Sequence, residues 1–143
     1  MAGETDLDAM LRTLQVERRP GVFAFLTLGP DAAERWRAQS LATITETEGI
    51  TVVVPADTAR AAGHGDAFEA AWLTLTVHSS LDAVGLTAAV STALAEAGIA
   101  CNMIAGFYHD HLLVPVDRAA EAAALLTSRW RPDTEGHVDH PSG

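Results

Sequence analysis

The sequence predicts an α+β fold in which helices pack on antiparallel sheets, and the clearest pattern lies in its second half. Residues 73–77 alternate apolar and polar side chains, which is the period of a half-buried strand. Residues 86–97 place leucine, valine and alanine on one helical face. Residues 99–108 and 112–116 then flank the polar triplet 109–111, as in a hairpin. A strand, a crossover helix and a second strand in one sheet form a right-handed βαβ unit.

The N-terminal part is predicted to begin with a helix that gives way to a strand. Four apolar residues share one helical face: Leu7, Met10, Leu11 and Leu14. Residues 18–21, Arg-Arg-Pro-Gly, are expected to end this helix and to open a strand over residues 22–28. Gly29 and Pro30 break that strand, and residues 31–39 are compatible with a short helix.

A hairpin and another helix come next. Residues 42–46 and 50–54 are extended runs, joined by a loop in which Gly49 is expected to adopt the left-handed backbone conformation. Pro55 suits the first turn of a helix, so a helix is predicted over residues 56–62, before the central strand begins.

In order, these elements pass twice through one pattern. Residues 22–77 read β, α, β, β, α, β, and residues 71–130 read β, α, β, β, α, with Asp117 as the cap of the last helix. This is the ferredoxin-like βαββαβ arrangement, and the two passes can share the strand at residues 73–77. The second pass lacks its final strand, because residues 131–143 are too polar and too rich in Pro and Gly to supply it.

We therefore expect two tandem units and a tail. The N-terminal unit covers residues 1–69, the C-terminal unit covers residues 70–131, and residues 132–143 are expected to be disordered. Small domains bury proportionally little surface, which favours edge pairing between the units and between two chains. A homodimer is therefore expected.

Composition excludes several classes of function. The formal net charge is −10, so phosphate backbones and anionic lipids would repel the chain, and neither a nucleic acid nor a membrane is expected as a partner. The chain has no lysine, which removes Schiff-base chemistry and the P-loop lysine. Cys101 is the only cysteine, so an internal disulfide and a cysteine-based zinc site are excluded. The start is acidic and has no signal-peptide pattern, which predicts a cytoplasmic protein.

The triplet His109-Asp110-His111 carries the side chains that zinc or iron prefers. In an extended strand the first and third residues share a face while the middle one points away, so a metal would keep two histidines at most. Further ligands would have to come from three other histidines: His78, His137 and His140. A polar turn is the favoured interpretation, and no cofactor is expected. A metal-dependent enzyme built on the triplet is the alternative.

Ser79 and Ser80 stand in the loop between a strand and a helix. They lack the G-x-S-x-G context of a catalytic nucleophile. One interpretation is helix capping. The other is ligand binding, because the backbone N–H groups and the dipole at a helix start favour a carboxylate, while Asp82 can bind an ammonium group. A loop that offers both partners suits a free amino acid.

Two runs carry a resemblance to a known family. Residues 81–86, Leu-Asp-Ala-Val-Gly-Leu, lead through a helix into residues 95–101, Ala-Glu-Ala-Gly-Ile-Ala-Cys. They resemble the core of the ACT domain, with its strand, glycine-bearing loop, helix and second strand. The longer segment 73–116 is similar to a group of small bacterial proteins with two ACT-like domains and no assigned reaction, and residues 46–53 resemble the first half of that group.

The resemblance implies tandem ACT-like units that bind an amino acid at an interface between two ACT domains and regulate a partner enzyme in trans, without catalysis of their own. The implied ligand-binding positions are Ser79, Ser80, Asp82, Ala83, Val84, Gly85, Leu86, Cys101, Asn102, Met103 and Ile104. The asparagine that many ACT domains carry after Gly-Ile is Ala100 here, and Asn102 on the same strand face can substitute for it.

Three further expectations concern packing and the ligand. Gly85 allows a ligand to approach the backbone, and Leu86, Met103 and Ile104 bound an apolar side-chain pocket. The members expected to be buried together are Cys101, Met103, Leu86, Val90 and Leu94, with Ala100 and Asn102 on the opposite face. A structural interaction module without a ligand is the remaining alternative.

Overall fold

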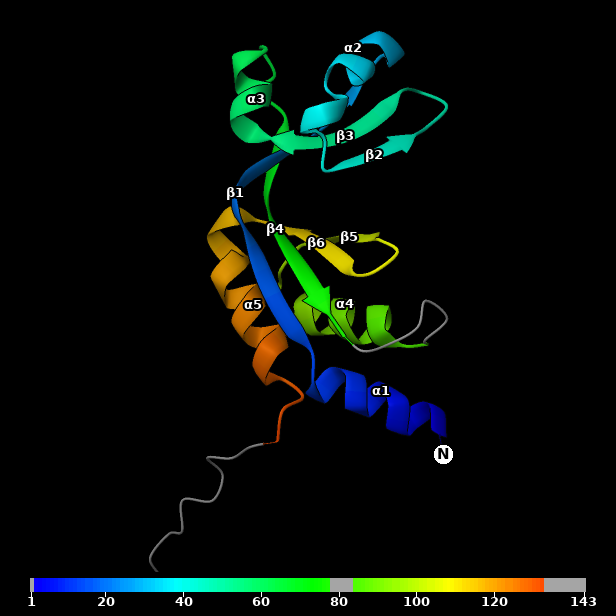
Figure 1. Cartoon of the computed structure of the whole chain (residues 1–143). Coiled ribbons are helices and arrows are strands. Elements are labelled where there is room, and N and C mark those ends of the chain that lie inside the picture. The colour runs from blue at the N-terminus through cyan, green and yellow to red at the C-terminus, as the bar shows by residue number, and fades with distance from the viewer. Residues whose placement is uncertain (1, 78–83, 133–143) are drawn as a thin grey trace, which may run out of the picture.

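The computed structural model describes residues 2–77 and 84–132, which form one six-stranded sheet with helices α2 to α5 on one of its faces (Figure 1). In chain order the elements are α1 (Ala2–Arg12), β1 (Gln15–Leu28), α2 (Pro30–Arg35), β2 (Ala42–Thr45), β3 (Ile50–Pro55), α3 (Ala56–Ala61), β4 (Phe68–Thr76), α4 (Leu86–Glu96), β5 (Asn102–Ala105), β6 (Asp110–Val114) and α5 (Ala119–Ser128). Short 3₁₀ helices cover Arg37–Gln39 and Val116–Arg118.

The sheet has the strand order β2-β3-β1-β4-β6-β5, and every neighbouring pair is antiparallel. The four strands β2-β3-β1-β4 have the ferredoxin-like order. The second unit has the same order in the strands β1-β4-β6-β5. Strand β1 is thus the outermost strand of the second unit, although it lies inside the six-stranded sheet. The predicted α+β fold of two ferredoxin-like passes is confirmed.

Strand β1 serves both units because its two segments have different partners. Residues 15–19 pair with the C-terminal part of β4, while residues 23–28 pair with β3 and with the start of β4. The register on β4 shifts between the two segments. Pro20, which has no N–H to donate, and Gly21, whose φ is +106°, lie at this irregularity.

Two predictions about this region are wrong. Helix α1 ends at Arg12, so residues 18–21 do not end it but lie inside β1. The second unit does not lack a fourth strand either, because residues 15–19 fill that place in the sheet. Arg131, which follows α5, donates an N–H from Nη2 to the carbonyl oxygen of Leu14 at 2.9 Å. The end of the second unit therefore lies where this strand begins.

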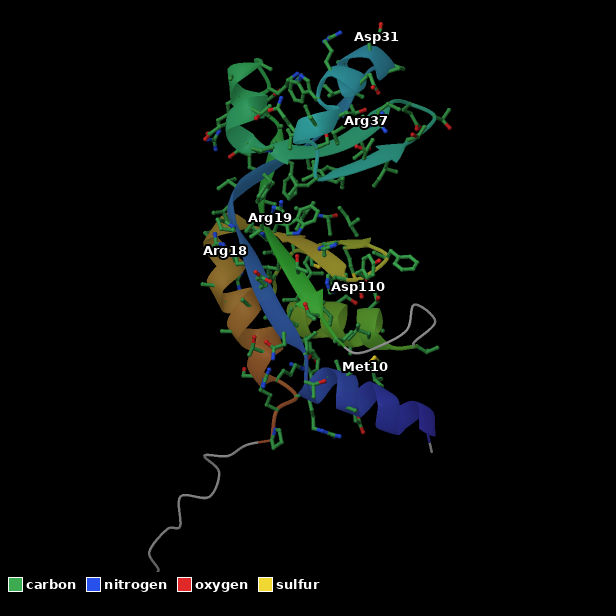
Figure 2. All side chains as sticks on the ribbon, viewed as in Figure 1. Met10, Arg18, Arg19, Asp31, Arg37 and Asp110 are labelled. Atoms are coloured by element: carbon green, nitrogen blue, oxygen red, sulfur yellow. The ribbon has the colours of Figure 1, made fainter. Side chains whose placement is uncertain are left out.

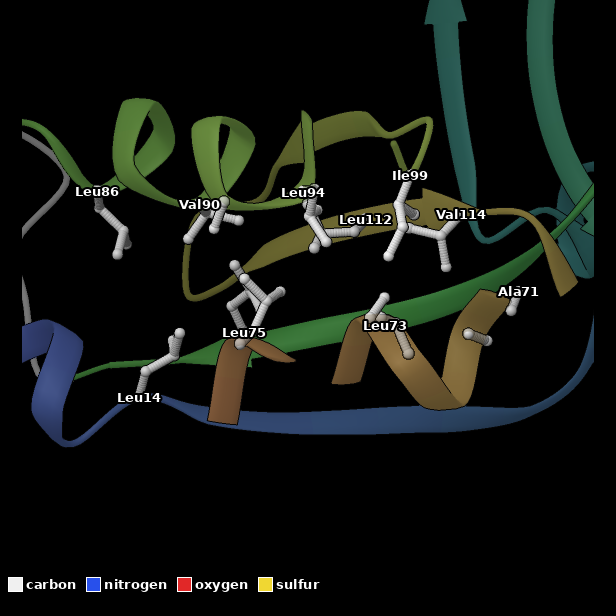
Figure 3. Packing of buried hydrophobic residues seen from close by; sticks show 14 of the residues in the cluster. Leu14, Ala71, Leu73, Leu75, Leu86, Val90, Leu94, Ile99, Leu112 and Val114 are labelled. Carbon is white, nitrogen blue, oxygen red and sulfur yellow. The ribbon is translucent and has the colours of Figure 1, made fainter. Parts of the chain in front are cut away.

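The helical face of the sheet carries two buried clusters, one for each unit. In the second unit, leucines of β4 and β6 meet the apolar stripe of α4 (Figure 3). The fully buried large side chains of this cluster are Leu14, Leu73, Leu75, Val90, Leu94, Leu112, Val114 and Leu126. Each such side chain contributes roughly 1.5–3 kcal/mol on burial. The first unit has a smaller cluster on α2 and α3: Ala24, Leu28, Val52, Val54, Ala56 and Ala59.

A third cluster lies on the opposite, open face of the sheet. We call it the elbow cluster, and it consists of Phe23, Val53, Ala70, Trp72 and Leu113. No described helix packs on these residues, yet Trp72 is only 4% exposed. The reason is the bend of β1 and β4, which makes the hairpins β2–β3 and β5–β6 project to the same side (Figure 1). The elbow cluster therefore holds the two units together.

Other predicted elements are present with shifted ends, and three details are corrected. Gly49 is not among the glycines with positive φ; it provides space, since a Cβ there would lie 2.5 Å from Thr27 Oγ1. Asp117 lies in a 3₁₀ helix, and no side chain caps α5. The strand predicted at residues 99–108 is limited to β5, and Asp110 and His111 belong to β6, so the hairpin turn is at residues 106–109.

The predicted burial around α4 is confirmed for Leu86, Val90 and Leu94, which are buried. Cys101 and Met103 contact the same cluster but are only half-buried. Ala100 and Asn102 are exposed. In the described part of the chain, no helix is both long enough and apolar enough to cross a membrane.

Candidate ligand site at the start of helix α4

The two ends of helix α4 differ in the side chains that the structure places near them. At its C-terminus, the guanidinium of Arg118 donates to the carbonyl oxygen of Ala97 at 3.0 Å and to that of Gly98 at 3.4 Å. Glu121 holds Arg118 in place at 2.7 Å, and this hydrogen bond lowers the pKa of the Glu121 carboxyl. Arg118 therefore places a positive charge just beyond the C-terminal end of α4, on the carbonyl groups of the C-cap residue Ala97 and of Gly98, which complements the helix dipole.

The N-terminus of α4 is different. Gly85 is the N-cap residue, and no side chain of the described residues caps the helix. The first N–H groups of a helix have no intrahelical partner, and the positive end of the dipole lies there. The first turn of α4 therefore presents hydrogen-bond donors that suit a carboxylate.

Gly85 is required by backbone conformation as well as by space. Its φ of +101° is in the left-handed region, which favours glycine. A Cβ on Gly85 would also lie 2.9 Å from Cδ2 of Leu7, because α1 packs over this point. Helix α1 thus covers one side of the α4 start, and any ligand has to approach from another side.

The predicted loop residues are only partly within the described structure. Ser79, Ser80, Asp82 and Ala83 lie outside the described residues. Val84 is 85% exposed, directly before the helix, and Leu86 is buried in the core. Among the described residues, the accessible part of this site is therefore Val84 and the first-turn backbone.

The predicted strand residues divide between two faces. Met103 packs with Cys101 against the core below α4, while Ile104 packs against the elbow cluster on the open face. Met103 and Ile104 therefore cannot bound one apolar pocket with Leu86, which is a correction to the sequence-based expectation. Burial raises the pKa of the Cys101 thiol, which makes this sulfur a weak nucleophile.

The topology shows which end of β5 lies near the start of α4. Strands β4 and β5 are both antiparallel to β6, so they run in the same direction. Ala105 aligns through Asp110 with Leu75, at the end of β4 that leads to the α4 start, whereas Asn102 aligns through Leu113 with Trp72. The C-terminal end of β5 is therefore the closer end, and Cys101 lies at the far one.

The alternative metal site on the triplet 109–111 gains no support from the geometry. Asp110 and His111 are neighbours on β6 and point to opposite faces, and His109 is exposed in the turn. Within residues 2–77 and 84–132, no group of three or more His, Cys, Asp or Glu side chains could hold a metal ion.

His111 instead belongs to a polar group on the open face. The indole Nε1–H of Trp72 donates to Thr74 Oγ1 at 3.1 Å, and Thr74 Oγ1 lies 3.0 Å from His111 Nδ1. The rings of Trp72 and His111 are 5.0 Å apart. Burial lowers the pKa of His111, and the charges of His109 and Arg19 lower it further.

Sequence analysis missed this group as a candidate site. The alternation of residues 73–77 places Trp72, Thr74 and Thr76 on one face of their strand, which was the available signal. The register that sets Thr74 opposite His111 and Trp72 opposite Arg19 joins segments far apart in the chain, and the sequence does not display it.

The chain thus has a pair of ferredoxin-like units and a helix start at Gly85 that no described side chain caps. Comparisons with known proteins assign this architecture to a family. The ACT domain family matches residues 2–71 and again residues 67–128. The chain belongs to the ACT domain family and contains two ACT domains in tandem.

Solved structures include one of the same size and arrangement. A Vibrio cholerae protein of unknown function, described as a possible transport protein, shares 37% identity, with a TM-score of 0.78 over 91% of this chain and 99% of that chain. An Agrobacterium tumefaciens protein shares 20% identity, with a TM-score of 0.61 over 82% and 90% of the two chains.

A more distant similarity is to an enzyme's regulatory part. The regulatory subunit of aspartate kinase from Thermus flavus shares 12% identity, with a TM-score of 0.53 over 79% of this chain and 94% of that chain. At this identity the similarity concerns the fold alone. No functionally curated protein matches the sequence. ACT domains are typically regulatory, which is the general role that these comparisons support.

Proposed function

We propose that the protein is a non-catalytic cytoplasmic regulator that binds a small metabolite, namely an amino acid, at the start of α4. The observation that carries the proposal is the first turn after Gly85 in an ACT domain, which no side chain of residues 2–77 or 84–132 caps, while Arg118 binds the carbonyl groups just beyond the other end of the same helix. The N–H groups of residues 86–88 would bind the α-carboxylate. Asp82, which precedes the described helix, would bind the ammonium group.

Regulation in trans is part of the proposal. The Vibrio cholerae protein is covered over 99% of its length by this pair of domains. The Thermus flavus neighbour is the regulatory subunit of aspartate kinase. By this analogy, the amino acid would change how the protein binds a partner enzyme, and the two chains of a homodimer would complete the ligand site between them.

A thermal-shift screen of the twenty amino acids tests the binding. A ligand that binds only the folded protein raises stability by RT ln(1 + [L]/Kd), about 2.7 kcal/mol at a hundredfold excess over Kd. For a domain of this size the melting temperature should rise by several degrees. A protein that melts at the same temperature with every amino acid would be a structural interaction module instead.

Gly85→Val is not a clean test of the site, because the left-handed backbone and the contact with Leu7 would destabilise the protein itself. Thr87→Glu is better. Thr87 is exposed in the first turn, so a carboxylate there suits the helix dipole but competes with the ligand for the same N–H groups. We expect an unchanged melting temperature without ligand and a lost response to the amino acid.

Ser91→Glu is the matched control. Ser91 is exposed one turn further along the same side of α4, where its hydroxyl donates to the carbonyl oxygen of Thr87 at 2.7 Å. The added charge is the same, but it lies away from the first-turn N–H groups. The response to the amino acid should survive Ser91→Glu. Equal loss in both variants would mean that general charge repulsion, and not the α4 start, controls binding.

A further inference from the structure

The open face of the second unit holds His111 in one orientation by three separate contacts. Thr74 Oγ1 lies 3.0 Å from Nδ1, and the Trp72 ring lies 5.0 Å away. On the other side, Gly106 adjoins the ring, since a Cβ there would lie 3.1 Å from His111 Nε2 and 2.9 Å from the carbonyl oxygen of His109.

Thr74 Oγ1 accepts from Trp72 Nε1–H and keeps one proton and one lone pair for His111 Nδ1. When the Thr74 hydroxyl donates to Nδ1, the ring proton of neutral His111 is on Nε2, and this is the tautomer that the proposal below uses. Burial keeps the pKa of His111 below its ordinary value of 6.5, so the neutral ring prevails near neutral pH and offers one N–H donor.

Arg19 brings a cation to the same face. It lies opposite Trp72 in the β1–β4 register, and its positive charge lowers the pKa of His111. Figure 2 shows Arg19 where β1 passes from the second unit to the first. The ion pairs formed by the described arginines involve Arg37, Arg60, Arg118 and Arg129, and Arg19 is not among them. Arg18, its neighbour, lies opposite Leu73 and thus on the other face.

The apolar side chain that adjoins these two donors is Ile104, which is half-buried and lies opposite His111 on β5. Trp72 lies between Arg19 and Leu113 but is only 4% exposed. Glu17, two residues before Arg19 and opposite Thr74, is the nearest carboxylate of this face on β1. Two donors, one of them charged, beside a half-buried isoleucine suit an anion with a short hydrocarbon tail.

We propose that Arg19 and His111 form an anion site on the open face of the second unit, which takes a small organic carboxylate. The guanidinium would bind the carboxylate oxygens, His111 Nε2–H would donate to one of them, and the apolar tail would lie against Ile104. This site is on the opposite face of the sheet from α4, so it does not depend on the proposed amino-acid site.

Isobutyrate is the probe, because it has the carboxylate and the apolar tail but no ammonium group. We would follow the indole N–H resonance of Trp72 by NMR during a titration at constant ionic strength. The expected result is a saturable shift in the unmodified protein. Arg19→Gln should weaken binding by about tenfold or more, as expected for loss of a charge-assisted hydrogen bond. Arg19→Lys, which keeps the charge, should retain part of the affinity.

Arg18→Gln and His109→Gln are the matched controls. Arg18→Gln makes the same change of charge on the other face, and should weaken binding by less than about twofold, because exposed charges are screened by salt. His111→Gln should lose most of the response, whereas His109→Gln, in the exposed turn, should keep it. The proposal fails if the shift does not saturate, or if Arg18→Gln and Arg19→Gln weaken binding equally, or if His111→Gln binds normally.

Discussion

Gly85 and Gly98 flank helix α4, and both have positive φ, +101° and +70° respectively. Their surroundings differ. A Cβ on Gly85 would meet Leu7, whereas a Cβ on Gly98 would have no atom within 4 Å. The two positions therefore separate the cost of backbone strain from the cost of a steric contact.

We predict that Gly98→Ala lowers the free energy of unfolding by about 1 kcal/mol, the cost of a left-handed non-glycine residue. Gly85→Ala should cost more, because its φ is less accessible to alanine and Leu7 has to move. Urea unfolding of the two variants measures the difference. Equal costs would show that α1 does not press on the α4 start in solution.

At His111, the sign of the pKa shift predicts the pH dependence of stability. Burial, together with the charges of His109 and Arg19, holds the folded-state pKa below 6.5, and Asp110 opposes this effect. Between the folded and unfolded pKa values the unfolded chain binds more protons, so stability falls as the pH is lowered below 6.5.

His111→Gln should therefore flatten the dependence of the melting temperature on pH in the range just below 6.5, while His109→Gln, with its side chain in the exposed turn, serves as the comparison. Melting curves recorded across that range provide the measurement. An identical slope in the unmodified protein and in His111→Gln would contradict the described environment of this ring.

Among the elements, β1 shows most clearly where sequence reasoning succeeded and where it failed. Residues 22–28 have the Val- and Phe-rich character of a strand and were predicted. Residues 15–19 were missed because only Val16 among them is apolar, and because Pro20 and Gly21 interrupt the pattern. They become a strand through pairing with β4, a long-range contact that overrides the weak local signal.

Among the candidate sites, too, features set by local sequence were predicted and features set by long-range strand pairing were not. The glycine-bearing start of α4 was predicted because a loop, a glycine and an apolar helical stripe follow one another in the chain. The Trp72–Thr74–His111 group was not, since it depends on the β4–β6 register. The pocket expected between Leu86, Met103 and Ile104 failed because adjacent strand residues point to opposite faces.

Residues 15–19, which provide the fourth strand of the second unit, lead to a prediction about that unit. Residues 67–131 alone should not fold, because β4 would lose its partner in residues 15–19. Joining Arg131 to Leu14 through a short linker, so that residues 14–19 follow α5, should restore a folded unit, since Arg131 Nη2 already lies 2.9 Å from the Leu14 carbonyl oxygen.

The control carries Leu14→Asp and Val16→Asp in the appended strand, which places charges on its core-facing side. Circular dichroism and melting curves distinguish the three chains. The prediction is wrong if residues 67–131 melt cooperatively without the strand, or if the charged control folds as well as the unmodified one.

At the scale of the whole molecule, the sheet has two outer strands, β2 and β5. Both are short and, within residues 2–77 and 84–132, each has a neighbouring strand on one side only, and Ile44 of β2 is 43% exposed. We predict a homodimer in solution. Size-exclusion chromatography with light scattering should give twice the mass of one chain at micromolar concentration, and a mass of one chain would contradict the prediction.

The two candidate sites lie on opposite faces of the sheet. Each site can therefore be followed through its own residues. The central claim is that an amino acid binds through the first-turn N–H groups of α4.

The most direct test is an NMR titration that follows backbone amides with the amino acid that raises the melting temperature most. The amide resonances of residues 86–88 should show the largest saturable shifts, and Thr87→Glu should abolish them while Ser91→Glu leaves them in place. Shifts confined to other residues, or a response that survives Thr87→Glu, would contradict the assignment of the ligand site to the start of α4.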